Sequence, residues 1–158
     1  MKKQRIYLDT SVFGGFFDDE FEEFTKPLFE RINRSEFTIL FSTILEGELE
    51  FAPENVRNLV LDIKNEDTVF IEEATDAIEL ANEYIAENVV GQTSYSDCLH
   101  IALATIHQAD LLVSWNFKHI VNIQRIRGYN AINIKNGYKQ LEIRSPRDLM
   151  DYGNKEKI

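Results

Sequence analysis

The carboxylates of Asp9, Glu48 and Asp97 are the side chains in this sequence that are best placed to do chemistry. Asp9 comes directly after a short apolar run. On a helical projection Glu48 points to the same side as Ile44 and Leu45, whereas most acids on a helix point away from its apolar residues. Asp97 opens an apolar helix, where the helix dipole favours a negative charge. Each acid therefore lies at the end of an element or on an apolar face.

Carboxylates that are held close together at a partly buried edge need a positive partner. At an effective dielectric constant near 20, a close pair of like charges repels by on the order of 4 kcal/mol. A divalent cation removes this repulsion, and Mg²⁺ prefers oxygen ligands and keeps several waters. Such waters can attack a phosphodiester while the ion neutralises the developing charge. The acids therefore predict a metal site that can hydrolyse phosphodiester bonds.

The sequence also leaves a structural interpretation open for each polar residue. Asp9 could form a turn or cap the next segment. Glu48 could pair with a buried Arg or Lys. Asn116 is a neutral oxygen ligand at best, and alone it is an ordinary turn residue.

Two pairs of residues have the spacing of a helix capping box. Thr43 and Glu46 form one, and Ser94 and Asp97 form the other. The first pair gives Glu46 a structural role, and the second pair is a structural alternative for Asp97.

The pattern of apolar and turn-forming residues predicts strands that alternate with helices. The strands are expected at residues 5–8, 37–42, 68–72, 111–114 and 141–143. Helices are expected at 25–34 (with Thr25 as its cap), 43–51, 54–65, 75–90, 96–108 and from Ser145 onward, with a loop before residue 25 and no clear period over 120–136. This order favours a parallel sheet covered on both faces, with a ligand at the carboxyl ends of its strands.

Composition bounds the compartment and the partners. The 158-residue chain has one cysteine, Cys98, and neither a signal-peptide pattern nor a run long enough to span a membrane, so we expect a cytoplasmic protein. The histidine spacing does not suit a zinc site. The formal net charge is −10, so an RNA-binding field must be local. The segment from Lys118 to Lys139 has no acid and holds the basic candidates Lys118, His119, Arg125, Arg127, Lys135 and Lys139.

Five of the eleven phenylalanines lie between Phe13 and Phe24. This segment is too apolar for a plain surface loop. We expect it to pack into the core or to form part of an interface with a second copy or with a partner protein.

Four segments, in this order and spacing, resemble the PIN domain family, the fold of VapC-type toxin ribonucleases. They are YLDTSVFGG, STILEGELE, SDCLHIALAT and LLVSWNFKHI, and the late NGY…EIRSPRDL segment is similar as well. The resemblance covers nearly the whole chain. We therefore expect a PIN-like domain over residues 1–152, and the charged residues 153–158 look like a tail. The family fold implies a three-layer α/β/α sandwich with a parallel sheet of four or five strands.

Carried over by position, the resemblance makes Asp9, Glu48 and Asp97 the catalytic, metal-binding acids. Ser11 corresponds to the hydroxyl that orders the site. Asn116 occupies the fourth position, which is often Asp in PIN domains, so one negative charge is missing here. The family further implies Mg²⁺ or Mn²⁺ as cofactor, RNA as substrate, a homodimer and, for toxin members, a small antitoxin.

Three hypotheses follow. The first is a metal-dependent endoribonuclease, the toxin of a toxin–antitoxin pair. The second is a catalytically weak or inactive PIN-like scaffold, which Asn116 and the negative charge would allow. The third is an unrelated α/β protein whose acids are caps and salt-bridge partners, and it requires the three acids to lie apart.

Overall fold

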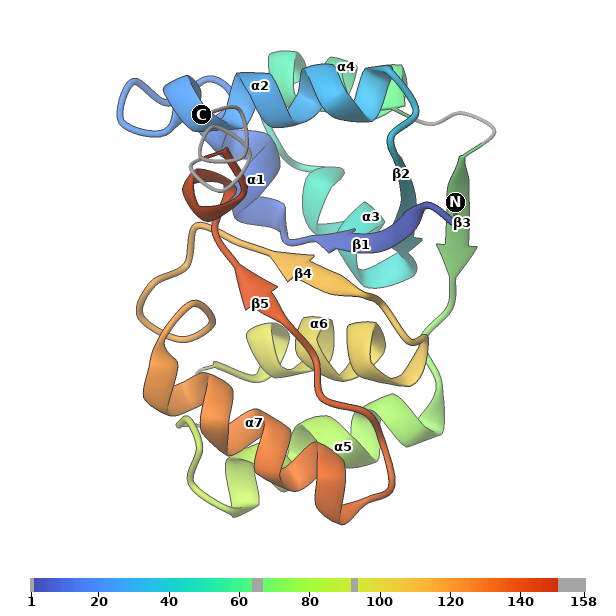
Figure 1. Ribbon diagram of the computed structural model, residues 1–158, viewed down its shortest axis with the longest axis vertical. Helices are drawn as coiled ribbons and strands as arrows, with labels where there is room; N and C mark the ends of the chain where they lie inside the picture. Colours follow the sequence, from blue (N-terminus) through green and yellow to red (C-terminus); the bar gives the residue numbers. More distant parts are fainter. Residues whose placement is uncertain (1, 64–66, 92–93, 151–158) are drawn as a thin grey trace.

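The computed structural model describes residues 2–63, 67–91 and 94–150. Its centre is a five-stranded, entirely parallel sheet with strand order β3-β2-β1-β4-β5 (Figure 1). The three-layer α/β sandwich expected from the sequence is thus confirmed. The strands are β1 (Gln4–Leu8), β2 (Phe37–Ser42), β3 (Thr68–Ile71), β4 (Leu111–Val113) and β5 (Ile143–Arg144).

Helices cover both faces of the sheet (Figure 1). One face carries α1 (Thr10–Gly15), α2 (Glu22–Asn33), α3 (Thr43–Leu49) and α4 (Glu54–Ile63), and the other carries α5 (Thr75–Ala86), α6 (Tyr95–Ile106) and α7 (Ile123–Lys135). Because strand residues alternate between faces, Ile6 and Leu8 enter the first core and Tyr7 the second. Within the described ranges, no helix is long and apolar enough to cross a membrane. The predicted tail at 153–158 lies outside the described residues.

Three sequence-based assignments differ from the structure. The predicted loop after Asp9 contains helix α1, although it ends in two glycines. Helix α2 begins at Glu22, so Thr25 is not its cap, and the Thr25 hydroxyl donates to the carbonyl of Phe21. The stretch without a clear period forms α7, whose cap is Asn122.

The Phe-rich segment packs into the core, which confirms one of its two predicted roles. Phe13 is fully buried, and three further rings, those of Phe16, Phe21 and Phe24, lie partly buried against the same cluster. Phe17 remains 40% exposed. The packing anchors α1 directly behind Asp9.

Trp115 ties the segment after β4 to α1 and α2. Its ring stacks on Phe21 with centroids 4.3 Å apart, and its Nε1–H donates to Thr25 Oγ1 at 2.9 Å. Gly15 faces this ring so closely that an added Cβ would lie 2.7 Å from Trp115 Nε1. Only glycine allows this approach, and the approach positions the residue that follows Trp115.

Replacing Gly15 with Ala should therefore destabilise the fold, by about 2 kcal/mol as for other overpacked sites. Gly14→Ala is the matched control, since a Cβ there meets nothing within 4 Å. In the control, alanine's better helix propensity should leave stability unchanged or raise it by about 0.5 kcal/mol. Urea unfolding measures both variants, and equal stabilities would contradict the packing account.

Candidate active site

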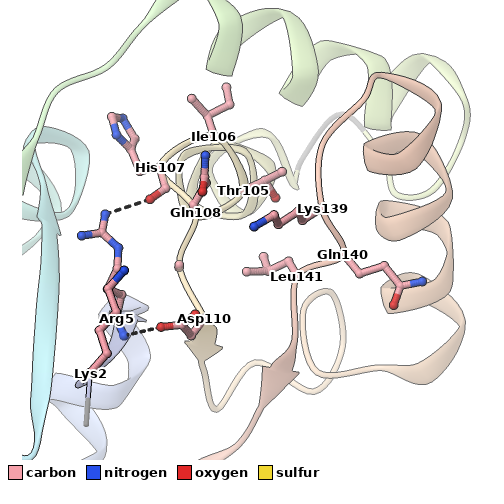
Figure 2. A pocket seen from close by; sticks show the side chains of 11 residues that line it. Lys2, Arg5, Thr105, Ile106, His107, Gln108, Asp110, Lys139, Gln140 and Leu141 are labelled. Atoms are coloured by element: carbon pink, nitrogen blue, oxygen red, sulfur yellow. Dashed lines mark hydrogen bonds between the residues drawn. The ribbon is translucent and has the colours of Figure 1, made fainter.

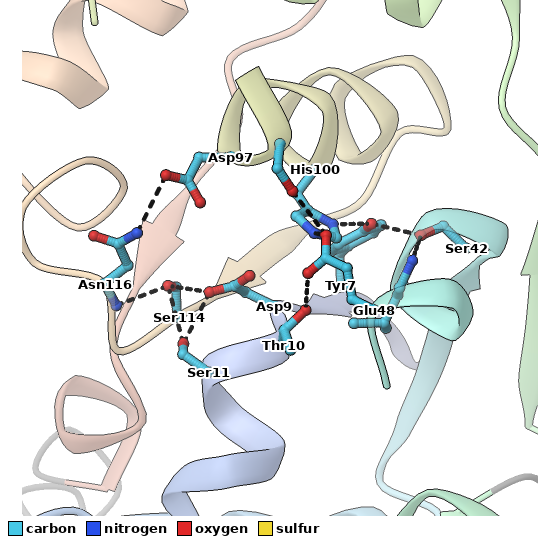
Figure 3. Close-up of polar contacts among 12 residues, drawn as sticks. Tyr7, Asp9, Thr10, Ser11, Ser42, Glu48, Asp97, His100, Ser114 and Asn116 are labelled. Atoms are coloured by element: carbon cyan, nitrogen blue, oxygen red, sulfur yellow. Dashed lines mark hydrogen bonds and ion pairs between the residues drawn. The ribbon is translucent and has the colours of Figure 1, made fainter. Parts of the chain in front are cut away.

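The predicted site residues gather where the parallel strands end (Figure 3). Asp9 follows β1, and its backbone N–H donates to the carbonyl of Val113 at 3.0 Å. Leu8 pairs with Val113 in register, so Asp9 comes beside Ser114, which follows β4. Helices α3 and α6 bring Glu48 and Asp97 to the same edge.

Asp9 is a buried carboxylate held by two hydroxyls. Its exposed fraction is 5%, and its Oδ2 accepts bonds from Ser11 Oγ and Ser114 Oγ, each at 2.8 Å. The Ser11 oxygen in turn accepts the backbone N–H of Trp115 at 2.9 Å. Ser11 thus connects Asp9 to the segment after β4. Although Asp9 precedes α1, its side chain makes no capping bond, so the capping interpretation of Asp9 is wrong.

Asn116 bridges β4 and α6. Its Nδ2 donates to Asp97 Oδ2 at 3.3 Å, and its Oδ1 accepts the backbone N–H of His119 at 3.0 Å. The backbone N–H of Asn116 donates to Ser114 Oγ at 2.9 Å, which links it to Asp9. In this orientation the Asn116 amide donates a hydrogen bond that holds the Asp97 carboxylate. A direct contact of its oxygen with a metal stays a prediction.

Glu48 lies on the exposed side of α3, with its side chain 31% exposed, and three side chains bind its carboxylate. Oε1 accepts from Ser96 Oγ at 2.8 Å and lies 2.7 Å from His100 Nε2, and Oε2 accepts from Thr10 Oγ1 at 2.5 Å. Thr10 follows Asp9 and Ser96 precedes Asp97, so Glu48 touches the neighbours of both other acids. The Arg or Lys partner considered from the sequence is replaced here by His100.

Burial and hydrogen bonds act on Glu48 in opposite directions. Burial raises its pKa, but the bonds from His100, Thr10 and Ser96 and the charge of His100 outweigh it and lower the pKa to about 2. Glu48 is therefore ionised at neutral pH. For His100, burial lowers the pKa, and the bond to Glu48 and the nearby acids more than offset this, so the net shift is upward.

The surroundings of Asp97 disfavour the ionised form of its carboxyl group. Burial, followed by the charge of Asp9, raises its pKa, and Glu48 adds to the rise while His119 and His100 oppose it. The acids therefore lie near enough to repel one another. This contradicts the hypothesis of scattered caps and salt-bridge partners, which required the acids to lie apart.

Both predicted capping boxes are also wrong. The cap of α3 is Ser42, one residue earlier than predicted, and its Oγ accepts the backbone N–H of Leu45 at 3.1 Å. Ser94 precedes α6 but makes no side-chain capping bond. Glu46 is exposed on α3.

The donors at this edge suit a hard divalent cation, but the acids are not arranged as a complete ligand set. Within the described residues, no three His, Cys, Asp or Glu side chains are placed to hold one metal ion. Mg²⁺ needs only one or two carboxylates and keeps the rest of its shell as water. Asp9 and Asp97 meet that need, since their side-chain hydrogen bonds within the described residues are made through Oδ2. The mutual repulsion that a cation would relieve is also present.

Sequence reasoning missed the polar residues that hold the acids. Glu48 is bound by Thr10 and His100, and Asp9 is bound by Ser114. Ser114 had a readable signal, because it ends an apolar strand beside the strand of Asp9. His100 had one too, because it lies on the apolar side of a helix one turn after Asp97.

The predicted basic segment is spread over a wide surface. Arg127 is exposed on α7, whereas the Arg125 guanidinium donates to the carbonyl of Val89. Lys118 is exposed and His119 is partly buried just beyond Asn116. Arg127 and Lys118 are thus the residues most available to a phosphate backbone.

A cavity of about 590 Å³ lies at the opposite end of the strands, away from the acids (Figure 2). Its lining includes Arg5 and Lys139, and the Arg5 guanidinium donates to the carbonyl of His107 at 2.9 Å. None of the predicted acids lines it. Lys139 therefore lies away from the edge where Asp9 is found.

Comparison with known proteins agrees with the geometry. The family model described as PIN domain matches residues 6–119, a span that includes all four predicted site residues. The fold is similar to a chain in the crystal structure of VapBC2 from Rickettsia felis bound to a DNA fragment from their promoter. That likeness has a TM-score of 0.56 and 19% sequence identity, and it covers 89% of this chain and 98% of the other. The comparison with curated proteins gave no match.

Proposed function

The chain belongs to the PIN domain family, and from this membership and the geometry of its acids we propose that it is a metal-dependent endoribonuclease. The observation that carries the proposal is the group of hydrogen-bonded, oriented carboxylates at the carboxyl edge of the sheet. Asp9 and Asp97 repel each other there, and a fold that keeps such repulsion is poised for a cation. Mg²⁺ or Mn²⁺ matches the oxygen donors.

Each polar residue has a distinct role in this proposal. Asp9, Glu48 and Asp97 would together hold the ion and its waters. Ser11 and Ser114 keep Asp9 in place through its Oδ2, and Asn116 does the same for Asp97. When bound, the ion would supply an activated water and neutralise charge on the phosphodiester.

We further propose that the enzyme is the toxin of a toxin–antitoxin pair, acts in the cytoplasm, and pairs with a small antitoxin and with a second copy of itself. The support is the similar fold of a chain in the VapBC2 crystal structure. The absence of a membrane-spanning helix in the described ranges is compatible with this setting.

Incubation of the purified protein with single-stranded RNA tests the catalytic proposal. Cleavage should require Mg²⁺ or Mn²⁺ and should stop on addition of EDTA, because the carboxylates alone supply neither an activated water nor a positive charge. Cleavage that persists in EDTA would contradict the metal. No cleavage of any RNA, together with intact metal binding, would favour an inactive scaffold.

RNA binding should depend on Arg127, which is exposed on α7. Arg127→Glu should weaken binding to every RNA sequence and lower the slope of the salt dependence by about 1. Arg57→Glu on α4 is the control, since it makes the same charge change at another exposed position. Arg125 is a poor choice because its contact with Val89 also serves the fold. Equal effects at Arg127 and Arg57 in a filter-binding titration would place the RNA elsewhere.

A further inference from the structure

His100 is a buried polar side chain for which the proposed chemistry has no direct use. It is 1% exposed and belongs to α6, one turn after Asp97. Its Nε2 lies 2.7 Å from Glu48 Oε1, and its Nδ1 lies 2.6 Å from the hydroxyl of Tyr7. The Tyr7 hydroxyl also lies 2.7 Å from Ser42 Oγ. An imidazole so deeply enclosed cannot touch RNA.

The chemistry of the carboxylate sets the direction of the bond between His100 and Glu48. An ionised carboxylate only accepts hydrogen bonds, so Nε2 carries the proton that binds Glu48. In the neutral ring Nδ1 is then an acceptor for the Tyr7 hydroxyl, and in the protonated ring Nδ1 donates to the Tyr7 oxygen. Burial raises the pKa of Tyr7 well above its usual value, so the phenol keeps its proton. In either state of the ring Nε2–H donates to Glu48, and the hydroxyls of Tyr7 and Ser42 share a further bond.

The order of these bonds connects Glu48 to the two elements that carry the other acids. Tyr7 lies on β1, two residues before Asp9, and His100 lies on α6 with Asp97. Glu48 itself lies on a short helix with an exposed flank, and a glutamate there would otherwise sample several rotamers. The imidazole therefore fixes the position of the Glu48 side chain relative to β1 and α6.

We propose that His100 is a positioning residue, whose Nε2–H holds the Glu48 carboxylate toward Asp9 and Asp97 for metal binding. This inference rests on the proposed function, since it assigns His100 a role in the same site. A residue that merely filled the core would be served as well by an apolar side chain. The two ring nitrogens, each with a partner, argue for the polar role.

Two substitutions of His100 by amide residues test the roles of its two ring nitrogens separately. Glutamine places its amide nitrogen as many bonds from Cα as His Nε2, so His100→Gln keeps a donor for Glu48. Asparagine matches Nδ1 instead, so His100→Asn keeps a polar partner for Tyr7 and loses the bond to Glu48. Calorimetric titration with Mn²⁺ should show a loss of affinity of about 10-fold or more for His100→Asn, in the range found for other residues that orient metal ligands. His100→Gln should bind nearly as well as the unmodified protein.

Thermal melting of the metal-free variants separates positioning from folding. Both substitutions disturb a buried site, so both should lower the melting temperature, and only His100→Asn should lose Mn²⁺ affinity. Equal Mn²⁺ affinities in the two variants, whether both weak or both unchanged, would overturn the role of the Nε2–H. If the unmodified protein binds no Mn²⁺, the proposed function itself fails, and the inference falls with it.

Discussion

Asp9→Asn should reduce RNA cleavage by about 100-fold or more, because loss of a direct metal ligand should cost at least as much as loss of a residue that only orients one. The substitution keeps the size of the side chain and an oxygen that can accept from Ser11 and Ser114. It removes the charge that would attract the cation. The fold should survive, because the two hydroxyl bonds to Oδ2 can still form.

A matched control guards this result against a general charge effect. Asp62→Asn makes the same chemical change at an exposed position of α4, and it should leave the cleavage rate unchanged. Cleavage rates are measured at saturating Mn²⁺ and again across a metal titration. Full activity in Asp9→Asn would remove the first acid from the mechanism.

Glu48→Gln should lower Mn²⁺ affinity and cleavage by about 10- to 100-fold, whereas Glu46→Gln should change neither. Glu48 is held by His100, Thr10 and Ser96, and its charge contributes to the raised pKa of Asp97. Glu46 is exposed on the same helix, so its substitution controls for the loss of one charge on α3.

The stability of Glu48→Gln gives a second readout. The bonds to Glu48 lower its pKa and so favour its ionised form, and the neutral amide should therefore melt at a slightly lower temperature without metal. A loss of stability with unchanged Mn²⁺ affinity would make Glu48 a structural partner of His100 only. Loss of activity in Glu46→Gln instead would mean that the wrong glutamate was chosen.

The sequence allowed the carboxyl edge of the sheet to be predicted because strand ends are local features. An apolar run followed by Asp9, and another followed by Ser114, can be read within a few residues. The helical phase also singled out Glu48 rather than Glu46, and Glu48 contacts Thr10, Ser96 and His100. These inferences require only the period of each element and the rule that parallel strands end at one edge.

The contacts between distant segments could not be read in the same way. Glu48 and His100 are 52 residues apart, and no local pattern announces that a histidine rather than an arginine meets the glutamate. Helix α1 was missed because two glycines disfavour a helix, while the space beside Trp115 requires one of them. Helix α7 was missed because Asn133, a polar residue, is buried within it and interrupts its apolar spacing.

Calorimetric titration of the unmodified protein and of Asp9→Asn with Mn²⁺ tests the central claim most directly. The claim is that the carboxylates at the end of β1, α3 and α6 form a divalent-metal site. We predict saturable binding to the unmodified protein and at least about 10-fold weaker binding to Asp9→Asn. No binding to the unmodified protein at millimolar Mn²⁺, or equal binding to both proteins, would contradict the claim.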